Sequence, residues 1–263
     1  ENNQGYSNLM KIVSKGFVDG YYYRPRVDME VLEQYHEGII ALSACLAGEV
    51  QRYLTRGMYE EAKETALKYE RCFGKGNFFL ELQDHGIAEQ AQVNQQLLRM
   101  HQELGIDLVA TNDVHYTYEK DAEAHDVLLC LQTGKKLSDE NRMRYEGGQY
   151  YVKSEEEMKA LFPYALEAIE NTQKIADRCH VEIEFGVTKL PKFDVPDGYT
   201  SWEYLNKLCY EGLDERYSPE RVRELKPRLE YELSVIQKMG YVDYFLIVWD
   251  FIHFARENDI MVG

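Results

Sequence analysis

Short apolar runs alternate with amphipathic stretches in the first part of the chain. Three of these runs predict buried strands: residues 39–44, 78–83 and 108–111. Residues 58–73 and 89–104 repeat apolar side chains at helical spacing, and each of these segments ends at a glycine. A strand, helix, strand, helix, strand order predicts an α/β fold in which the strands pair in parallel through helical crossovers.

The later part of the chain has a helical pattern. Ser154 and Glu157 form a capping-box sequence before a helix predicted over 155–162, and Pro163 is predicted to open another helix in which Leu166 faces inward. Residues 190–198 contain two prolines and a glycine, which predicts a domain boundary. Three more helices are predicted after it: residues 201–216, 219–239 and 243–258.

The segment Gly20–Arg26 reads Gly-Tyr-Tyr-Tyr-Arg-Pro-Arg and follows a helix predicted over 6–17. Its aromatic and basic side chains are of the kind that stack on nucleotides. Tyrosine-rich segments also pack against their own protein, and this second interpretation is favoured. The segment is therefore predicted to be a packed loop.

Polar residues with metal-binding chemistry follow the predicted strands. Cys45 follows the first, Asp84 and His85 the second, and Asp113 and His115 the third. Because functional sites of parallel α/β folds gather at the carboxyl ends of the strands, these residues are expected to converge. A thiolate, an imidazole and a carboxylate together favour zinc or manganese, with room for a water nucleophile.

Each of these residues also has a purely structural interpretation. Cys45 can be a buried free thiol that packs as a small hydrophobic side chain. His85 and Asp84 are candidates for a second shell, in which they would hydrogen-bond to the metal ligands or cap a loop. His125 lies on a predicted helix four residues after Asp121 and is interpreted as a helix-face residue.

Charge, apolar run length and cysteine content limit the classes of protein to which the chain can belong. The net charge is −16, and the acidic excess is spread along the chain, with 21 Lys/Arg against 32 Asp/Glu in residues 1–190 and 9 against 14 in residues 191–263. This excess of acidic residues argues against a protein surface that binds nucleic-acid phosphates along its length. The longest apolar run, residues 244–248, is too short to cross a membrane. Five scattered cysteines without a CxxC pair or signal peptide favour the cytoplasm.

Several motifs resemble a known family. Five segments resemble the polymerase and histidinol phosphatase (PHP) domain as it stands at the front of bacterial DNA polymerase III alpha subunits, the C-family replicative polymerases: residues 2–14, 42–50, 82–86, 109–116 and 121–130. Residues 189–196 and 239–256 resemble the beginning of the palm of the same enzymes. The chain starts without methionine and stops within an apolar segment, so a fragment truncated at both ends is expected.

The resemblance implies a domain order and a set of metal ligands. Residues 1–188 would be part of a PHP (β/α)7 barrel that is incomplete at its N-terminus, 189–198 a linker, and 199–263 a mainly helical start of the palm. Cys45, Asp113 and His115 match the family's later metal ligands, whereas an early His-x-His motif would precede Glu1. The family's phosphate-binding and magnesium-binding motifs for polymerisation would follow Gly263.

The function implied is that of part of a DNA-directed DNA polymerase, which joins deoxynucleotides to a primer 3′ end. The PHP domain would hydrolyse phosphodiesters as an exonuclease or serve as a scaffold. The implied cofactors are zinc or manganese in the PHP domain and magnesium for polymerisation. The implied partners are primer–template DNA, deoxynucleotides, the sliding clamp and other replisome subunits, with no membrane. Two alternatives remain open: a stand-alone PHP metallophosphoesterase, and a metal-free interaction module.

Overall fold

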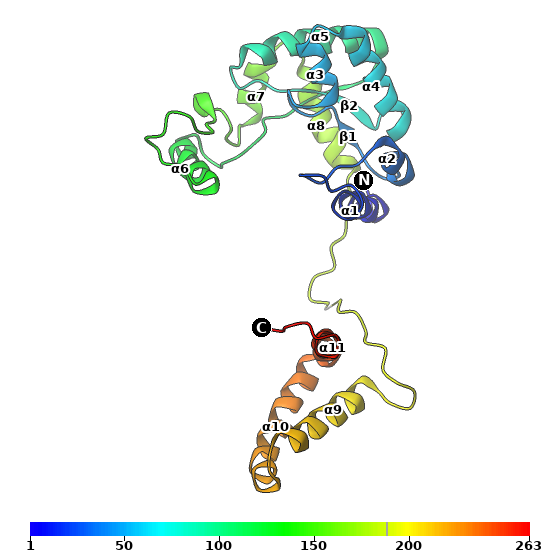
Figure 1. The fold of residues 1–263 in the computed structure, drawn as a ribbon. Coiled ribbons are helices and arrows are strands. Elements are labelled where there is room, and N and C mark those ends of the chain that lie inside the picture. Colours follow the sequence, from blue (N-terminus) through cyan, green and yellow to red (C-terminus); the bar gives the residue numbers. More distant parts are fainter. Residues whose placement is uncertain (188) are drawn as a thin grey trace. The chain divides into compact units, whose positions relative to one another are not determined.

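Residues 1–187 and 189–263 are described by a computed structural model of the chain, which divides into two units, Glu1–Ile183 and Glu184–Gly263. The last residue of the predicted first domain, residue 188, lies outside the described residues. Residues 189–198, the predicted linker, contain no helix or strand. Figure 1 shows both units.

The first unit is built on three parallel strands. They are β1 (Ala41–Leu42), β2 (Phe78–Leu82) and β3 (Leu108–Ala110), in the spatial order β1-β2-β3. Helices α3 (Glu49–Thr55) and α4 (Tyr59–Phe73) connect β1 to β2, and α5 (Ala88–Leu104) connects β2 to β3. The predicted parallel pairing is confirmed. The seven-stranded barrel is not, because the described residues form a helix-rich α/β unit with a three-stranded sheet.

The core of this unit lies around β2, the central strand. Leu80 and Leu82 are fully buried beside Leu108 of β3, and Leu97 and Met100 of α5 pack into the same cluster. Both side-chain faces of β2 are covered, which explains why Phe78–Leu82 is a nearly continuous apolar run and not an alternating one. Burial of this strand holds the polar residues that follow it in a fixed position.

Further helices complete the first unit: α1 (Asn3–Val18), α2 (Met29–Tyr35), α6 (Ala122–Thr133), α7 (Glu155–Leu161), α8 (Leu166–Arg178) and two short 3-10 turns (Glu119–Asp121 and Glu146–Gly148). The capping box of Ser154 and Glu157 is confirmed at the start of α7. The prediction for Pro163 is wrong, since α8 begins at Leu166, which is exposed. A turn separates α7 from α8, and it places Phe162 and Ala165 in the core.

The loop Gly20–Arg26 departs from the prediction. Tyr21, Tyr22 and Tyr23 are all exposed, so the interpretation as a tyrosine-rich packed loop is wrong. The reason is that the loop closes on itself at the end of α1, where Gly20 lies against the Arg26 backbone, and this closure turns the three rings outward.

The second unit contains three helices, α9 (Ser201–Arg216), α10 (Pro219–Met239) and α11 (Val242–Glu257). All three predictions are confirmed to within one residue. The helices share a small core of Leu205, Leu233 and Leu246. Asp243, in the first turn of α11, accepts hydrogen bonds from the Phe193 N–H and the Ser201 hydroxyl, which ties the incoming chain to the helices.

Among the helices of residues 1–187 and 189–263, none combines the length and the apolar character that a bilayer span requires.

Candidate functional site

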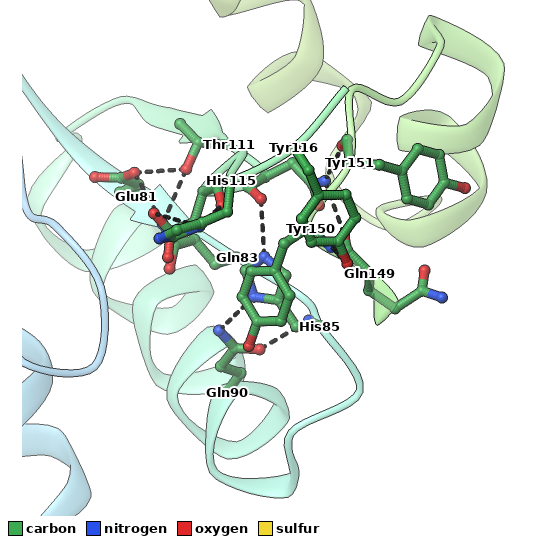
Figure 2. A network of polar contacts seen from close by, with 12 residues as sticks. Glu81, Gln83, His85, Gln90, Thr111, His115, Tyr116, Gln149, Tyr150 and Tyr151 are labelled. Atoms are coloured by element: carbon green, nitrogen blue, oxygen red, sulfur yellow. Dashed lines mark hydrogen bonds and ion pairs between the residues drawn. The ribbon is translucent and has the colours of Figure 1, made fainter. Parts of the chain in front are cut away.

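Glu81 links the ends of the three strands. Its carboxylate accepts a hydrogen bond from the Thr111 hydroxyl after β3 at 2.5 Å and another from the Ala44 N–H after β1 at 3.0 Å. Gln83, directly after β2, donates to both Glu81 (3.3 Å) and Thr111 (3.1 Å), as Figure 2 shows. A carboxylate inside an apolar strand is costly unless it is hydrogen-bonded, and here those bonds join all three strand ends.

The end of β1 is fastened to α3. The Gln51 side-chain amide donates to the Ser43 hydroxyl at 2.6 Å and to the Ala44 carbonyl at 2.9 Å. Cys45, the next residue, is exposed and lines a cavity of only about 10 Å³ together with Gln51 and Glu81. A cavity of this size holds at most one water molecule, so it offers no space for a substrate.

His85 is buried, and both of its ring nitrogens have partners. Nδ1 accepts a hydrogen bond from the Gln90 side-chain amide at 3.0 Å, and Nε2 donates to the Asn112 carbonyl oxygen at 2.9 Å. The ring stacks on Tyr150 with centroids 4.1 Å apart and planes inclined by 9°. Because the carbonyl can only accept and the Gln90 amide nitrogen donates, Nε2 carries a proton and Nδ1 serves as the acceptor. His85 therefore joins the ends of β2 and β3.

Asn112 holds the turn that carries the predicted ligands. Its side-chain amide donates to the carbonyl oxygens of Gln149 at 3.0 Å and Tyr151 at 2.7 Å. The His115 N–H donates to the Tyr150 carbonyl oxygen at 2.8 Å. Two segments that are far apart in the sequence are thereby connected, and the turn over Asp113–His115 takes its position from both.

Asp113 and His115 lie side by side at the surface of this turn. Asp113 has a φ of +43°, which is uncommon for a residue with a side chain. His115 Nδ1 donates to the Asp113 carbonyl oxygen at 2.6 Å and lies 3.9 Å from the Asp113 carboxylate. With the proton on Nδ1, the lone pair of Nε2 is available to bind a metal ion or accept a proton.

Aromatic and imidazole rings surround His115. Its ring centroid lies 4.5 Å from that of Tyr145 and 5.5 Å from that of His125 on α6. Burial, and then the neighbouring His115, lower the pKa of His125, which favours the neutral ring. Burial, with the Asp113 charge nearby, raises the pKa of Tyr150.

A larger hollow lies beside β3. It has a volume of about 690 Å³, and its walls include Thr111, Asn112 and Val114 on one side and Lys153 and Lys174 on another. Cys45 is not part of its lining. The hollow is therefore next to the turn that carries Asp113 and His115.

The structure brings two of the three predicted metal ligands together. Asp113 and His115 are neighbours, whereas Cys45 lies in a separate small cavity, and no three His, Cys, Asp or Glu side chains of residues 1–187 and 189–263 form a group that could hold a metal ion. The described donors by themselves do not fit a metal site. The role of Cys45, Asp113 and His115 as ligands stays a prediction.

The predicted second-shell residues have local partners. His85 bonds to the backbone just before Asp113, as a supporting residue would. Asp84 accepts a hydrogen bond from the Gly86 N–H at 2.9 Å and so caps the turn after β2.

Sequence reasoning missed four members of this network: Glu81, Gln90, Asn112 and Tyr150. Glu81 had a signal, because a lone carboxylate interrupts an apolar strand. Gln90, Asn112 and Tyr150 had none, since their roles depend on segments that only the fold brings together.

Family models match two separate parts of the chain. The PHP domain model matches residues 1–85, and the model of the bacterial DNA polymerase III alpha NTPase domain matches residues 203–263. The chain therefore joins a PHP domain to polymerase III alpha sequence, in the order expected from its motifs.

Curated relatives of the chain are named DNA polymerase III subunit alpha. The relative from Treponema pallidum is 47% identical over 264 residues, which cover 100% of this chain and 22% of the relative. The one from Borreliella burgdorferi is 46% identical over 265 residues, covering 100% and 23%. The one from Thermus aquaticus is 34% identical over 319 residues, covering 98% and 26%. The predicted resemblance is confirmed, and the chain spans about a quarter of the length of these relatives.

Proposed function

We propose that the chain is part of a bacterial replicative DNA polymerase. The observation that supports this best is the similarity to polymerase III alpha subunits along the whole chain, through both matched domains. The full-length protein would join deoxynucleotides to a primer 3′ end with release of pyrophosphate, using magnesium. A stand-alone phosphoesterase would not account for the match over residues 203–263.

The proposed division follows the motifs. Residues 1–188 would belong to a PHP domain that in the full-length protein is a (β/α)7 barrel, 189–198 would be a linker, and 199–263 would begin the palm. The three parallel strands with helical crossovers support the first assignment. The absence of helix and strand from residues 189–198, within the part that the structure describes, supports the second.

Primer extension tests the proposed activity. Full-length protein should extend a primer on a template with all four deoxynucleotides and magnesium, and a protein ending at Gly263 should not. A full-length protein that hydrolyses phosphate monoesters and extends no primer would contradict the proposal.

For the PHP domain we propose two roles, of which the scaffold has direct support. Glu81 and Gln83 bond to each other and to Thr111, and His85 bonds to Gln90 and the Asn112 backbone, which is the arrangement of a rigid support. The second role, a phosphoesterase or exonuclease, needs a divalent ion such as zinc or manganese near Asp113 and His115.

Thiol labelling tests the metal proposal. Cys45 and Cys179 are both free and exposed, so Cys179 is a matched control. If Cys45 is a ligand, zinc or manganese should slow alkylation of Cys45 in the full-length protein and leave Cys179 unchanged. His115→Ala should abolish the protection, and chelation should restore the fast rate. Equal rates with and without metal would remove Cys45 from the site.

The proposed surroundings follow from the polymerase function. They are primer–template DNA, deoxynucleotides, the sliding clamp and other replisome subunits, in the cytoplasm. The net charge of −16 suggests that most contacts with DNA phosphates are made by other parts of the full-length protein.

A further inference from the structure

Three consecutive tyrosines of the loop Gly20–Arg26 stand in solvent. Tyr21 is 60% exposed, Tyr22 64% and Tyr23 80%. Single exposed aromatic residues are common on protein surfaces, but adjacent ones form an apolar patch, which marks interaction sites. None of these tyrosines lines either cavity of the candidate site described above.

Backbone contacts within the loop hold its shape. A methyl group at Gly20 would lie 1.9 Å from the Arg26 carbonyl oxygen, so the two ends of the loop are in direct backbone contact. The Tyr22 N–H donates to the Arg24 carbonyl oxygen at 3.1 Å. Tyr23, at the tip, has a φ of +59°. A tyrosine in this left-handed region is strained, and such strain gathers at binding sites.

The charge of the loop is opposite to that of the chain. Neither Arg24 nor Arg26 has an acidic partner within residues 1–187 and 189–263. The flanking acids are engaged elsewhere, because Asp19 pairs with Lys15 at 2.7 Å and Asp28 caps α2 through the Val31 N–H. The Arg26 guanidinium lies 5.5 Å from the Tyr22 ring centroid, which keeps cation and aromatic face together.

We propose that the loop Gly20–Arg26 binds single-stranded DNA. Unpaired bases would stack on the tyrosine rings, and the two guanidinium groups would contact the phosphates between them. Duplex DNA does not fit, because its bases are already stacked. An acidic peptide would engage the arginines and leave three rings in water. This proposal goes beyond the proposed function, since it requires neither a metal ion nor polymerisation.

Photo-crosslinking in the full-length protein tests the contact at residue level. The probe is a thymidine oligonucleotide carrying 5-iododeoxyuridine, and the crosslinked peptides are identified by mass spectrometry. The expected result is a crosslink to Tyr21, Tyr22 or Tyr23 that a ten-fold excess of unlabelled oligonucleotide removes. Crosslinks elsewhere without any in residues 20–26 would overturn the proposal.

Matched variants separate the roles of rings and charges. The double variant Arg24→Gln, Arg26→Gln should reduce crosslinking. The slope of log K for the oligonucleotide against log salt should become less negative by about 1.4, since each phosphate contact on a single strand contributes about 0.7 to it. Tyr23→Gly, which suits the backbone of the tip, should weaken binding about ten-fold. Tyr231→Ala and Arg223→Gln, exposed positions on α10, serve as controls and should change nothing.

A competitor distinguishes the other kind of partner. An acidic peptide should not displace the oligonucleotide from the loop at equal charge concentration. Displacement by the peptide together with unchanged crosslinking in Tyr23→Gly would show that the loop recognises charge alone, and the proposal would fail.

Discussion

His85 connects two strand ends through its side chain. Gln90 holds one ring nitrogen, the Asn112 carbonyl holds the other, and Tyr150 covers the ring face. A buried imidazole with both nitrogens bonded is held rigidly, because any rotation would leave buried polar groups unpaired. The position of Asp113 and His115 thus depends on the contacts of His85.

Replacement of this histidine tests its role. His85→Ala should lower the free energy of unfolding around β2 and β3 by about 3 kcal/mol, because a cavity forms and the Gln90 and Asn112 groups lose their partner. Hydrogen exchange of peptides covering the two strands measures the loss. His180→Ala, at an exposed position of the same unit, should change it by less than about 0.5 kcal/mol. Equal effects of the two variants would contradict the interpretation.

The ion pair of Asp126 and Arg142 predicts a pH dependence. Arg142 donates to both Asp126 oxygens, at 2.5 and 2.6 Å, and these hydrogen bonds lower the pKa of Asp126. A carboxyl whose pKa is lowered on folding adds stability above its unfolded pKa of about 3.9 and loses that stability as the pH falls through the folded value. The contact between α6 and residues 134–149 should therefore loosen only below about pH 4.

Hydrogen exchange of residues 134–149, corrected for the pH dependence of intrinsic exchange, measures this loosening. In Asp126→Asn the segment should exchange faster at neutral pH and show no further change on acidification. If the segment of the unchanged protein loosened between pH 6 and 7 instead, a histidine would be responsible and the assignment to Asp126 would be wrong.

At the scale of elements, helix ends show which sequence signals have physical effect. Thr200 precedes α9, and its hydroxyl accepts a hydrogen bond from the Glu203 N–H while the Glu203 carboxylate accepts from the Thr200 N–H. Ser218 precedes α10 in the same way, but its side chain makes no capping bond, and Pro219 occupies the first helical position. The same kind of residue thus caps one helix and not the next.

These two residues make a matched pair of variants. Thr200→Ala should destabilise the second unit by about 1 kcal/mol, because the Glu203 N–H loses its acceptor and the Glu203 carboxylate loses the hydroxyl that donates to it. Ser218→Ala should cost less than about 0.5 kcal/mol. Both tryptophans of the chain, Trp202 and Trp249, lie in this unit, so urea unfolding followed by tryptophan fluorescence reports on it alone. A larger loss for Ser218→Ala would show that the capping bonds are assigned to the wrong helix.

For the molecule as a whole, the acidic excess opposes the compact state. Residues 184–263 contain 15 Asp/Glu against 10 Lys/Arg. Several exposed pairs offset the repulsion on these helices, among them Lys207–Glu211 and Arg228–Glu232, but exposed pairs contribute only about 0 to 1 kcal/mol each. Net repulsion should therefore outweigh them.

Salt tests this balance. Raising the concentration of sodium chloride should raise the urea midpoint of the second unit, because the screening of like charges outweighs the loss of the exposed pairs. The tryptophan signal gives the midpoint at each salt concentration. A midpoint that falls with salt would mean that the ion pairs, and not the excess of acid, dominate.

Local patterns determined much of what was predicted correctly. Apolar runs, helical periodicity, capping boxes and glycine ends located the three strands and most helices, because each signal acts over a few neighbouring residues. The motif likeness that identified the polymerase III alpha relatives is likewise a property of short segments. The start of α8 was predicted wrongly. The chain turns after Phe162 because Phe162 and Ala165 are buried in a core to which distant strands contribute, and no local signal shows this.

The sequence by itself thus determined the order of elements, their parallel pairing and the residues with candidate chemistry. Only the tertiary structure decided which of these residues meet. It paired Asp113 with His115, placed Cys45 beside a small cavity that it shares with Gln51 and Glu81, enclosed His85 between Gln90 and Asn112, and left the tyrosines of residues 20–26 exposed. The physical reason is that burial and hydrogen bonding between distant segments depend on how the elements pack, which no local spacing encodes.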